Sequence, residues 1–125
     1  MAKTEGLVKS MRAGDAADRL KAIKAVRDGI IGNKAKKKKF LHAGAVPVIA
    51  DAMADAPAGD PALLVACAVT MGSFAVGLDA GAAAVLSAGG LVTLLRSMTS
   101  DDSAVVVAAV RALNVLCQVR KPHCL

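Results

Sequence analysis

The sequence has almost no aromatic side chains. It contains two phenylalanines, Phe40 and Phe74, and neither tryptophan nor tyrosine, so its hydrophobic share of 55% comes almost wholly from aliphatic residues. Small aliphatic side chains of this kind suit closely packed helices. A chain of 125 residues forms one domain at most, which excludes a multidomain enzyme.

The residue sets that usually carry catalysis or bind metals are also missing. The sequence contains no Ser/His/Asp set, no paired carboxylates at an apolar mouth, no glycine-rich phosphate loop and no CxxC pair. Its two histidines are His42, beside a predicted helix end, and His123, which together with Cys124 supplies only two metal ligands. We therefore expect a protein that is not an enzyme and that needs no cofactor or metal.

Signals for secretion are absent as well. The three cysteines, Cys67, Cys117 and Cys124, are an odd number without paired spacing, which is typical of a reducing intracellular compartment. Lys3 and Lys9 interrupt the stretch where a signal peptide would need an unbroken apolar run. We expect the protein in the cytoplasm and the nucleus.

Two long stretches without charge raise the alternative of a membrane protein. Residues 61–78 and 80–95 carry no charged side chain. However, Asp60 and Asp79 flank the first stretch, and no aromatic belt or basic flank accompanies it. We therefore interpret these stretches as buried helices and keep a small membrane protein as a minor alternative.

Positive charge is concentrated in the first third of the chain. The formal net charge is +6, but residues 1–42 hold twelve of the sixteen lysines and arginines and only four of the ten acids. The densest cluster consists of Lys34, Lys36, Lys37, Lys38 and Lys39. Four consecutive helical residues spread around the helix and form no focused patch, so we expect a solvated surface. The alternative is a basic module that contacts acidic partners or, less expected, nucleic acid through Lys34–Lys39.

The sequence repeats itself at a spacing of about forty-five residues. The equivalent pairs are Gly32 and Gly77, Phe40 and Val85, Gly44 and Gly89, Val46 and Leu91, Ile49 and Leu94, and Met53 and Met98. Val26, Met71 and Leu113 follow the same frame, with a spacing of forty-two residues in the second step. A repeat of this length, made of two short helices and one long helix, has the layout of armadillo or HEAT repeats.

Local signals place the helices within this frame. Asp15, Asp60 and Pro61 mark helix starts, while Gly32-Asn33 and Gly77 mark helix ends. The pattern predicts helices over 15–31, 34–42, 46–53, 61–76, 79–87, 91–98 and 103–119. We divide the chain into a leader with a partial second helix (1–14), the third helix of a partial repeat (15–32), two complete repeats (33–77 and 78–119) and a tail (120–125).

Several motifs resemble the armadillo-repeat family. Gly44-Ala45-Val46-Pro47 is similar to the family's turn into the second helix, and Met71-Gly72-Ser73-Phe74-Ala75 to its third-helix signature. Together with Ile30-Ile31-Gly32-Asn33-Lys34 and Cys67-Ala68-Val69, they resemble the first repeats of the armadillo subunits of CTLH ubiquitin ligases, called GID in yeast. The resemblance implies a right-handed superhelix of about two and a half armadillo repeats.

The resemblance also implies a function. Armadillo subunits of these ligases are scaffolds that join a substrate receptor to RING-type catalytic subunits and have no active site of their own. We therefore expect a non-catalytic interaction protein, a truncated subunit of such a ligase, whose partners are other ligase proteins. Binding of a nuclear-localisation peptide is not expected, because the asparagine that importin-type repeats use is replaced by Asp28, Ser73 and Val115, and no tryptophan is present.

Armadillo proteins line their concave groove with the third helices, so polar residues on the long helices are the candidate partner contacts. They are Lys24, Arg27, Asp28, Ser73, Arg111, Asn114 and Gln118.

We expect structural hinges at Gly32, Gly44, Pro47, Gly77 and Gly89. The last long helix has no following repeat, so Val106, Val110, Leu113 and Cys117 should form an open apolar surface through which the fragment self-associates.

Overall fold

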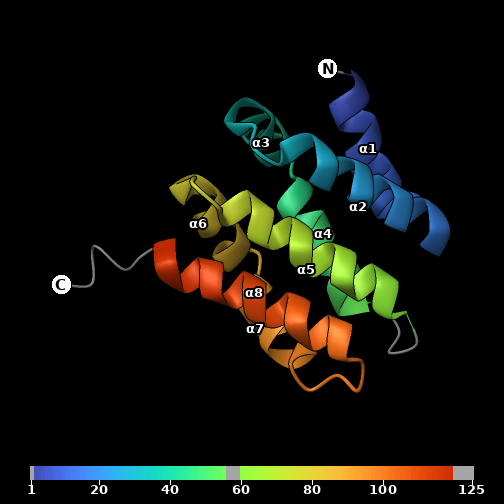
Figure 1. The fold of residues 1–125 in the computed structure, drawn as a ribbon. Helices are drawn as coiled ribbons and strands as arrows, with labels where there is room; N and C mark the ends of the chain where they lie inside the picture. The colour runs from blue at the N-terminus through green and yellow to red at the C-terminus, as the bar shows by residue number, and fades with distance from the viewer. Residues whose placement is uncertain (1, 56–59, 120–125) are drawn as a thin grey trace.

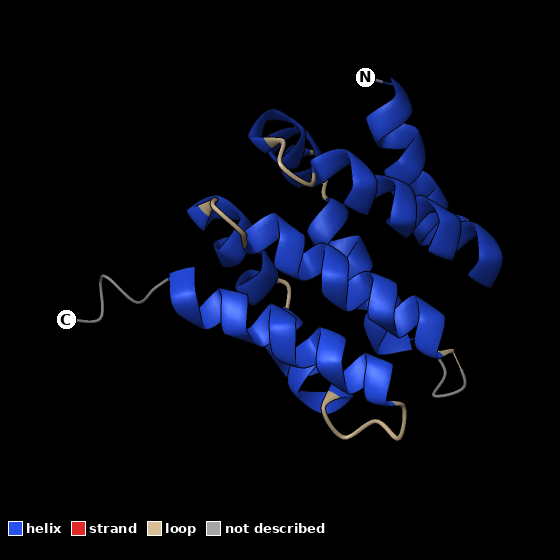
Figure 2. Cartoon of the chain, in the orientation of Figure 1, coloured by secondary structure: helices blue, strands red, loops and turns tan. Residues whose placement is uncertain are grey.

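The protein, described here as a computed structural model, is all-helical, as the sequence predicted. The structure describes residues 2–55 and 60–119, and within these ranges it contains eight helices and no strand (Figure 2). They are α1 (Ala2–Ala13), α2 (Ala16–Ile30), α3 (Lys34–His42), α4 (Ala45–Asp55), α5 (Pro61–Ala75), α6 (Asp79–Ser87), α7 (Gly90–Ser97) and α8 (Ser103–Val119). The tail that contains His123 and Cys124 lies outside the described residues.

The three long helices begin in the same way, on an aspartate cap. The Asp15 and Asp60 carboxylates accept hydrogen bonds from the backbone N–H groups of Asp18 (2.9 Å) and Leu63 (3.3 Å). Asp102 does the same for Ala104 at the start of α8, at 2.9 Å. Each carboxylate satisfies backbone donors that the helix leaves free, so the starts of all three helices are encoded locally.

The turns of the two complete three-helix units also match in conformation. Gly32 and Gly77 have φ values of 69° and 67°, and Gly44 and Gly89 have values of 82° and 80°. These are four of the five positions at which the sequence placed hinges, and they are the positive-φ residues of the described chain. Pro47, the fifth, lies exposed in the first turn of α4. Matching backbone angles at matching positions show that the chain builds the same turns twice.

The long helices α2, α5 and α8 lie side by side, and the short helices lie behind them (Figure 1). The α5 helix is the centre of the molecule, because it contacts α2 on one side and α8 on the other. A Cβ atom added to Gly72 would lie 3.3 Å from Ala112 Cα, so α5 and α8 approach each other closely. Phe74, Met71 and Cys67 on α5 are fully buried in the core between the two layers.

Two details differ from the sequence-based expectation. Asn33 does not end α2: its side chain accepts a hydrogen bond from the Lys36 backbone N–H at 3.0 Å and therefore starts α3. Residues 1–14 do not divide into a leader and a partial helix, because α1 continues from Ala2 to Ala13. The sequence signal was ambiguous at Asn33, since asparagine suits both ends of a helix.

No single helix among the described residues is both long and apolar enough to cross a bilayer. The pair α6 and α7 reaches that length and composition only when both helices are counted together, and the chain bends by 77° between them.

Candidate interaction surface

The exposed and half-buried side chains of α2, α5 and α8 form the surface that we call the long-helix face. It includes Lys24, Arg27 and Asp28 on α2, Val65, Val69 and Ser73 on α5, Val76 directly after α5, and Arg111, Asn114 and Gln118 on α8. All seven polar residues predicted as partner contacts are therefore at least partly accessible. The structure adds a feature that the polar pattern did not reveal, namely the apolar line of valines along α5.

A pocket of about 420 Å³ lies where the three long helices meet near the start of α5. Lys24 and Arg27 form one wall and Ala104 belongs to the other, while Ala62 and Val65 line the space between them. The pocket thus combines an apolar floor with basic side chains on the α2 side, while Asp102 on the α8 side is occupied by capping that helix. Such a combination suits a partner segment with an apolar anchor and a neighbouring acidic group.

The predicted contact residues differ in whether their polar groups already have a partner within the chain. Arg27 and Asp28 form an ion pair, with 3.1 Å between Nε and Oδ1, so each partly neutralises the other. The Ser73 hydroxyl donates to the Val69 carbonyl oxygen at 2.9 Å and is therefore used within α5. Lys24 lines the pocket described above, and Gln118 lines a second pocket of about 310 Å³ near the ends of α5 and α8.

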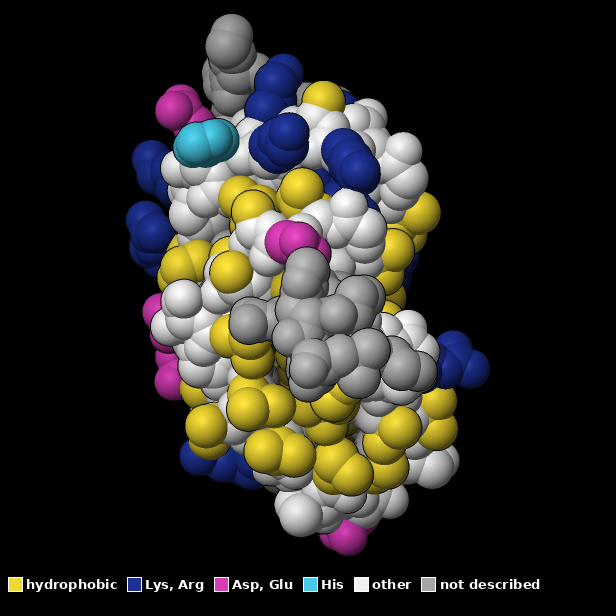
Figure 3. All heavy atoms as spheres, turned by 90° about the vertical axis from the view of Figure 1, so that its left-hand side faces the viewer, with side chains coloured by type: hydrophobic (Ala, Val, Ile, Leu, Met, Phe, Trp, Pro, Cys, Tyr) yellow, Lys and Arg dark blue, Asp and Glu magenta, His cyan; other side chains and the backbone are white. Residues whose placement is uncertain are grey.

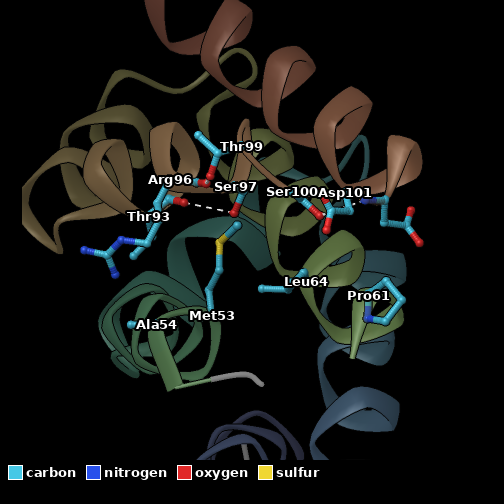
Figure 4. A pocket seen from close by; sticks show the side chains of 11 residues that line it. Met53, Ala54, Pro61, Leu64, Thr93, Arg96, Ser97, Thr99, Ser100 and Asp101 are labelled. Carbon is cyan, nitrogen blue, oxygen red and sulfur yellow. Dashed lines mark hydrogen bonds between the residues drawn. The ribbon is translucent and has the colours of Figure 1, made fainter. Parts of the chain in front are cut away.

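A larger pocket of about 580 Å³ adjoins the first, with which it shares Pro61 and Asp102, and lies between α4, α5 and α7 (Figure 4). Its hydroxyl groups are already engaged: Ser97 donates to the Thr93 carbonyl oxygen at 2.9 Å, and Thr99 donates to that of Arg96 at 2.7 Å. Side chains that bond their own helix or turn in this way stabilise it, so these hydroxyl hydrogens are not available to a ligand. We therefore do not take this pocket as the candidate site, despite its size.

The lysine run is not uniformly solvated, and for Lys37 that expectation was wrong. Only 4% of Lys37 is exposed, and its Nζ donates to the Val76 carbonyl oxygen at the end of α5, at 2.7 Å. Burial lowers the pKa of Lys37, and the charge of Lys34 lowers it further. Lys36, Lys38 and Lys39 are exposed as expected. An ammonium group at a helix C-terminus is favourable because it meets carbonyls that lack helical partners.

Replacing Lys37 should therefore destabilise the protein, unlike replacing its neighbours. We expect Lys37→Ala to lower the free energy of unfolding by about 1–3 kcal/mol, because a charged hydrogen bond and buried methylene groups are lost. Because the pKa of Lys37 is lowered in the folded state, the unfolded chain binds more protons than the folded chain. The contribution of Lys37 to the free energy of unfolding therefore rises as the pH approaches the ordinary lysine pKa of 10.5.

Urea denaturation followed by circular dichroism measures this difference, since the chain has no tryptophan for fluorescence. The exposed Lys38→Ala is the matched control and should change stability by no more than about 0.5 kcal/mol. Equal effects of the two substitutions would show that the Lys37 contact contributes nothing.

The possible metal ligands of the described residues do not cluster. No group of three His, Cys, Asp or Glu side chains within 2–55 and 60–119 is placed to hold a metal ion. Cys67 is fully buried, and burial raises the pKa of its thiol to about 12, so it stays protonated near neutral pH. His42 lies exposed in the last turn of α3.

Comparison with known proteins shows that the fold is similar to that of solved structures. No protein-family model and no curated protein matches the chain. Two crystal structures of engineered proteins from the Northeast Structural Genomics Consortium are similar, each with 27% sequence identity and a TM-score of 0.84. They cover 93% and 92% of this chain, which spans 46% of the length of each. The fold and the comparison place the chain in the class of layered, all-helical proteins.

Proposed function

We propose that the protein is a non-catalytic scaffold of the armadillo type, which binds partner proteins through the long-helix face. The observation that carries this proposal is the pocket between α2, α5 and α8, where Lys24 and Arg27 border an apolar floor. The repeated turns and the row of long helices support the armadillo assignment, because armadillo units stack with their third helices side by side.

The partner class follows from the resemblance of residues 30–34, 44–47 and 67–77 to armadillo subunits of CTLH ubiquitin ligases. We propose that the chain binds RING-type subunits or other subunits of such a ligase and so contributes to proteasome-dependent degradation. This role requires no catalytic residue in the chain itself.

Affinity capture of the tagged full chain from cells, with mass spectrometry of the eluate, tests the proposal. We expect ligase subunits in the eluate, and at least about a tenfold loss of them for Val69→Glu, because a carboxylate replaces an apolar contact in the middle of α5. Lys38→Glu, which is also exposed but lies on α3, serves as the control and should retain the subunits.

Each failure of this experiment has a different meaning. If no ligase subunit is captured, the ligase assignment is wrong. If the subunits are captured equally by wild type and Val69→Glu, the long-helix face is not the binding surface. Nucleic acid bound with a steep salt dependence, and lost when the exposed lysines of α3 become glutamine, would instead favour the basic module.

A further inference from the structure

The accessible side chains of the long helices form rows that run across the long-helix face. Helix α5 is enclosed between α2 and α8, and one stripe of it, which includes Val65, Val69 and Ser73, remains accessible on this face. The repeat frame links each of these positions to α2, forty-five residues earlier, and to α8, forty-two residues later. Because the three helices lie side by side and run in the same direction (Figure 1), equivalent positions form a row across all three.

Two neighbouring rows differ in chemistry. The apolar row contains the aliphatic residues at one set of equivalent positions, Leu20, Val65 and Val107. Leu20 and Val65 are half-buried, and Val107 is 48% exposed. The charged row lies one helical turn further along and contains Lys24, Val69 and Arg111, which are all exposed. The face therefore presents a line of aliphatic side chains beside two cations that flank a valine.

The two cations of the charged row are available to a ligand. Among the described residues, neither Lys24 nor Arg111 forms an ion pair. Asp28 is engaged by Arg27, with 3.1 Å between Nε and Oδ1, and Asp102 caps α8. Figure 3 shows Lys and Arg side chains gathered over the upper part of the molecule, at the height where Figure 1 places α2 and α3. The α2 end of the long-helix face therefore attracts acidic partners most strongly.

We propose that the long-helix face binds an extended acidic segment of a partner protein, which crosses the three long helices along these two rows. The inference rests on the proposed function, because it names the chemistry of the partner that this face binds. Aliphatic side chains of the segment cover the apolar row, while two carboxylates meet Lys24 and Arg111. A nucleic-acid strand would supply the anionic groups but no aliphatic side chains for the apolar row.

The packing of the helices determines the spacing of the two carboxylates. Neighbouring helices lie about 8–10 Å apart, so Lys24 and Arg111, two helices apart, are separated by about 16–20 Å along the row. An extended chain advances about 3.3 Å per residue, so this span takes about five or six residues. Successive side chains of an extended chain point to opposite sides, so only an even spacing brings both carboxylates to the charged row. We therefore expect acids about six residues apart, with aliphatic side chains at the alternate positions that face the apolar row.

Fluorescence anisotropy of a labelled, end-blocked peptide with the full chain tests the proposal. The peptide has a glutamate at each end and the order leucine, serine, leucine, serine, leucine between them. We expect saturable binding at protein concentrations below about 1 mM. Glutamine in place of both glutamates should weaken binding about tenfold, because two exposed ion pairs are lost. An isomer in which the second glutamate exchanges places with the nearest serine has the same composition but the wrong spacing, and it should bind at least about threefold more weakly.

Substitutions in the charged row test the same contacts from the side of the protein. The chain with both Lys24→Glu and Arg111→Glu should prefer a peptide with lysine at each end over the glutamate peptide by about tenfold. Lys24→Gln with Arg111→Gln provides a second variant if the first does not fold, as judged by circular dichroism, and it should lose the preference for glutamate over glutamine. The matched control for Lys24→Glu is Lys21→Glu, which is exposed on α2 outside the rows and should change the affinity by no more than about twofold.

The outcomes distinguish this inference from the proposed function. A wild-type chain that binds no peptide, equal binding of the glutamate, glutamine and isomeric peptides, or equal effects of Lys24→Glu and Lys21→Glu would each overturn the inference. Each of these results would do so even if ligase subunits are captured through the long-helix face. Peptide binding with the expected preferences would support the inference even if the capture experiment yields no ligase subunit.

Discussion

Replacing Gly81 by alanine is expected to lower the free energy of unfolding by at least about 3 kcal/mol. Gly81 lies in the first turn of α6, where a Cβ atom would stand 1.8 Å from the carbonyl oxygen of Phe74 and 2.6 Å from its carbonyl carbon. Both atoms belong to the backbone, so no side-chain rotation relieves the overlap, and α6 must move away from the end of α5. Because small domains are stable by only about 5–15 kcal/mol, much of the native stability should be lost.

A glycine with free space around it provides the control. A Cβ atom on Gly29, in the last turn of α2, would meet only the side chain of Lys36, at 3.8 Å. Gly29→Ala should therefore raise the free energy of unfolding by about 0.4–1 kcal/mol, because alanine favours the helix and restricts the unfolded chain. The comparison is made by urea denaturation of both variants. A Gly81→Ala protein as stable as the wild type would show that α6 does not rest directly on the α5 backbone.

Truncation of Phe74 is expected to have the second large effect. Phe74 is among the largest side chains that are completely buried, and it lies on α5, which contacts both neighbouring long helices. Phe74→Ala should lower the free energy of unfolding by about 3–5 kcal/mol, since it removes apolar area from the core and leaves a cavity. For a domain of this size that corresponds to a fall in melting temperature of about 10–20 °C.

Thermal unfolding followed by circular dichroism measures this fall. Val76→Ala, two residues further along but half exposed, should change stability by no more than about 0.5 kcal/mol. Phe74→Leu retains most of the apolar volume and should lie between the two. If Phe74→Ala and Val76→Ala melted at the same temperature, α5 would not be the central element of the core.

Much of the helical architecture could be predicted from the sequence, because its signals act over a few residues. The aspartate caps at Asp15 and Asp60 and the glycines at positions 32, 44, 77 and 89 determine where helices start and where the chain turns. The predicted bounds of the helices Lys34–His42 and Asp79–Ser87 agree with the structure to the residue. Such features depend on the neighbouring backbone, so a linear pattern is sufficient to find them.

The candidate surface was only partly accessible to sequence reasoning. The resemblance to armadillo proteins, together with the polar positions of the predicted long helices, led to Lys24, Arg27 and the other predicted contacts, and the structure places them on the long helices. The valines at positions 65, 69 and 76 were not identified as part of that surface, since an apolar residue on an apolar helix is indistinguishable in sequence from a core residue. Only their exposure in the folded chain separates them from Phe74 and Met71.

The sequence alone determined that this protein is a row of helices built from a repeated unit, with its positive charge at the N-terminal end. The tertiary structure decided which members of equivalent pairs are buried. Lys37 is enclosed within a run of exposed lysines, and Gly81 rests on the α5 backbone although its equivalent, Lys36, is exposed. Leu95 is exposed where Ala50 is covered. The reason is physical: burial depends on the helix that lies opposite, and residues distant in sequence supply that helix.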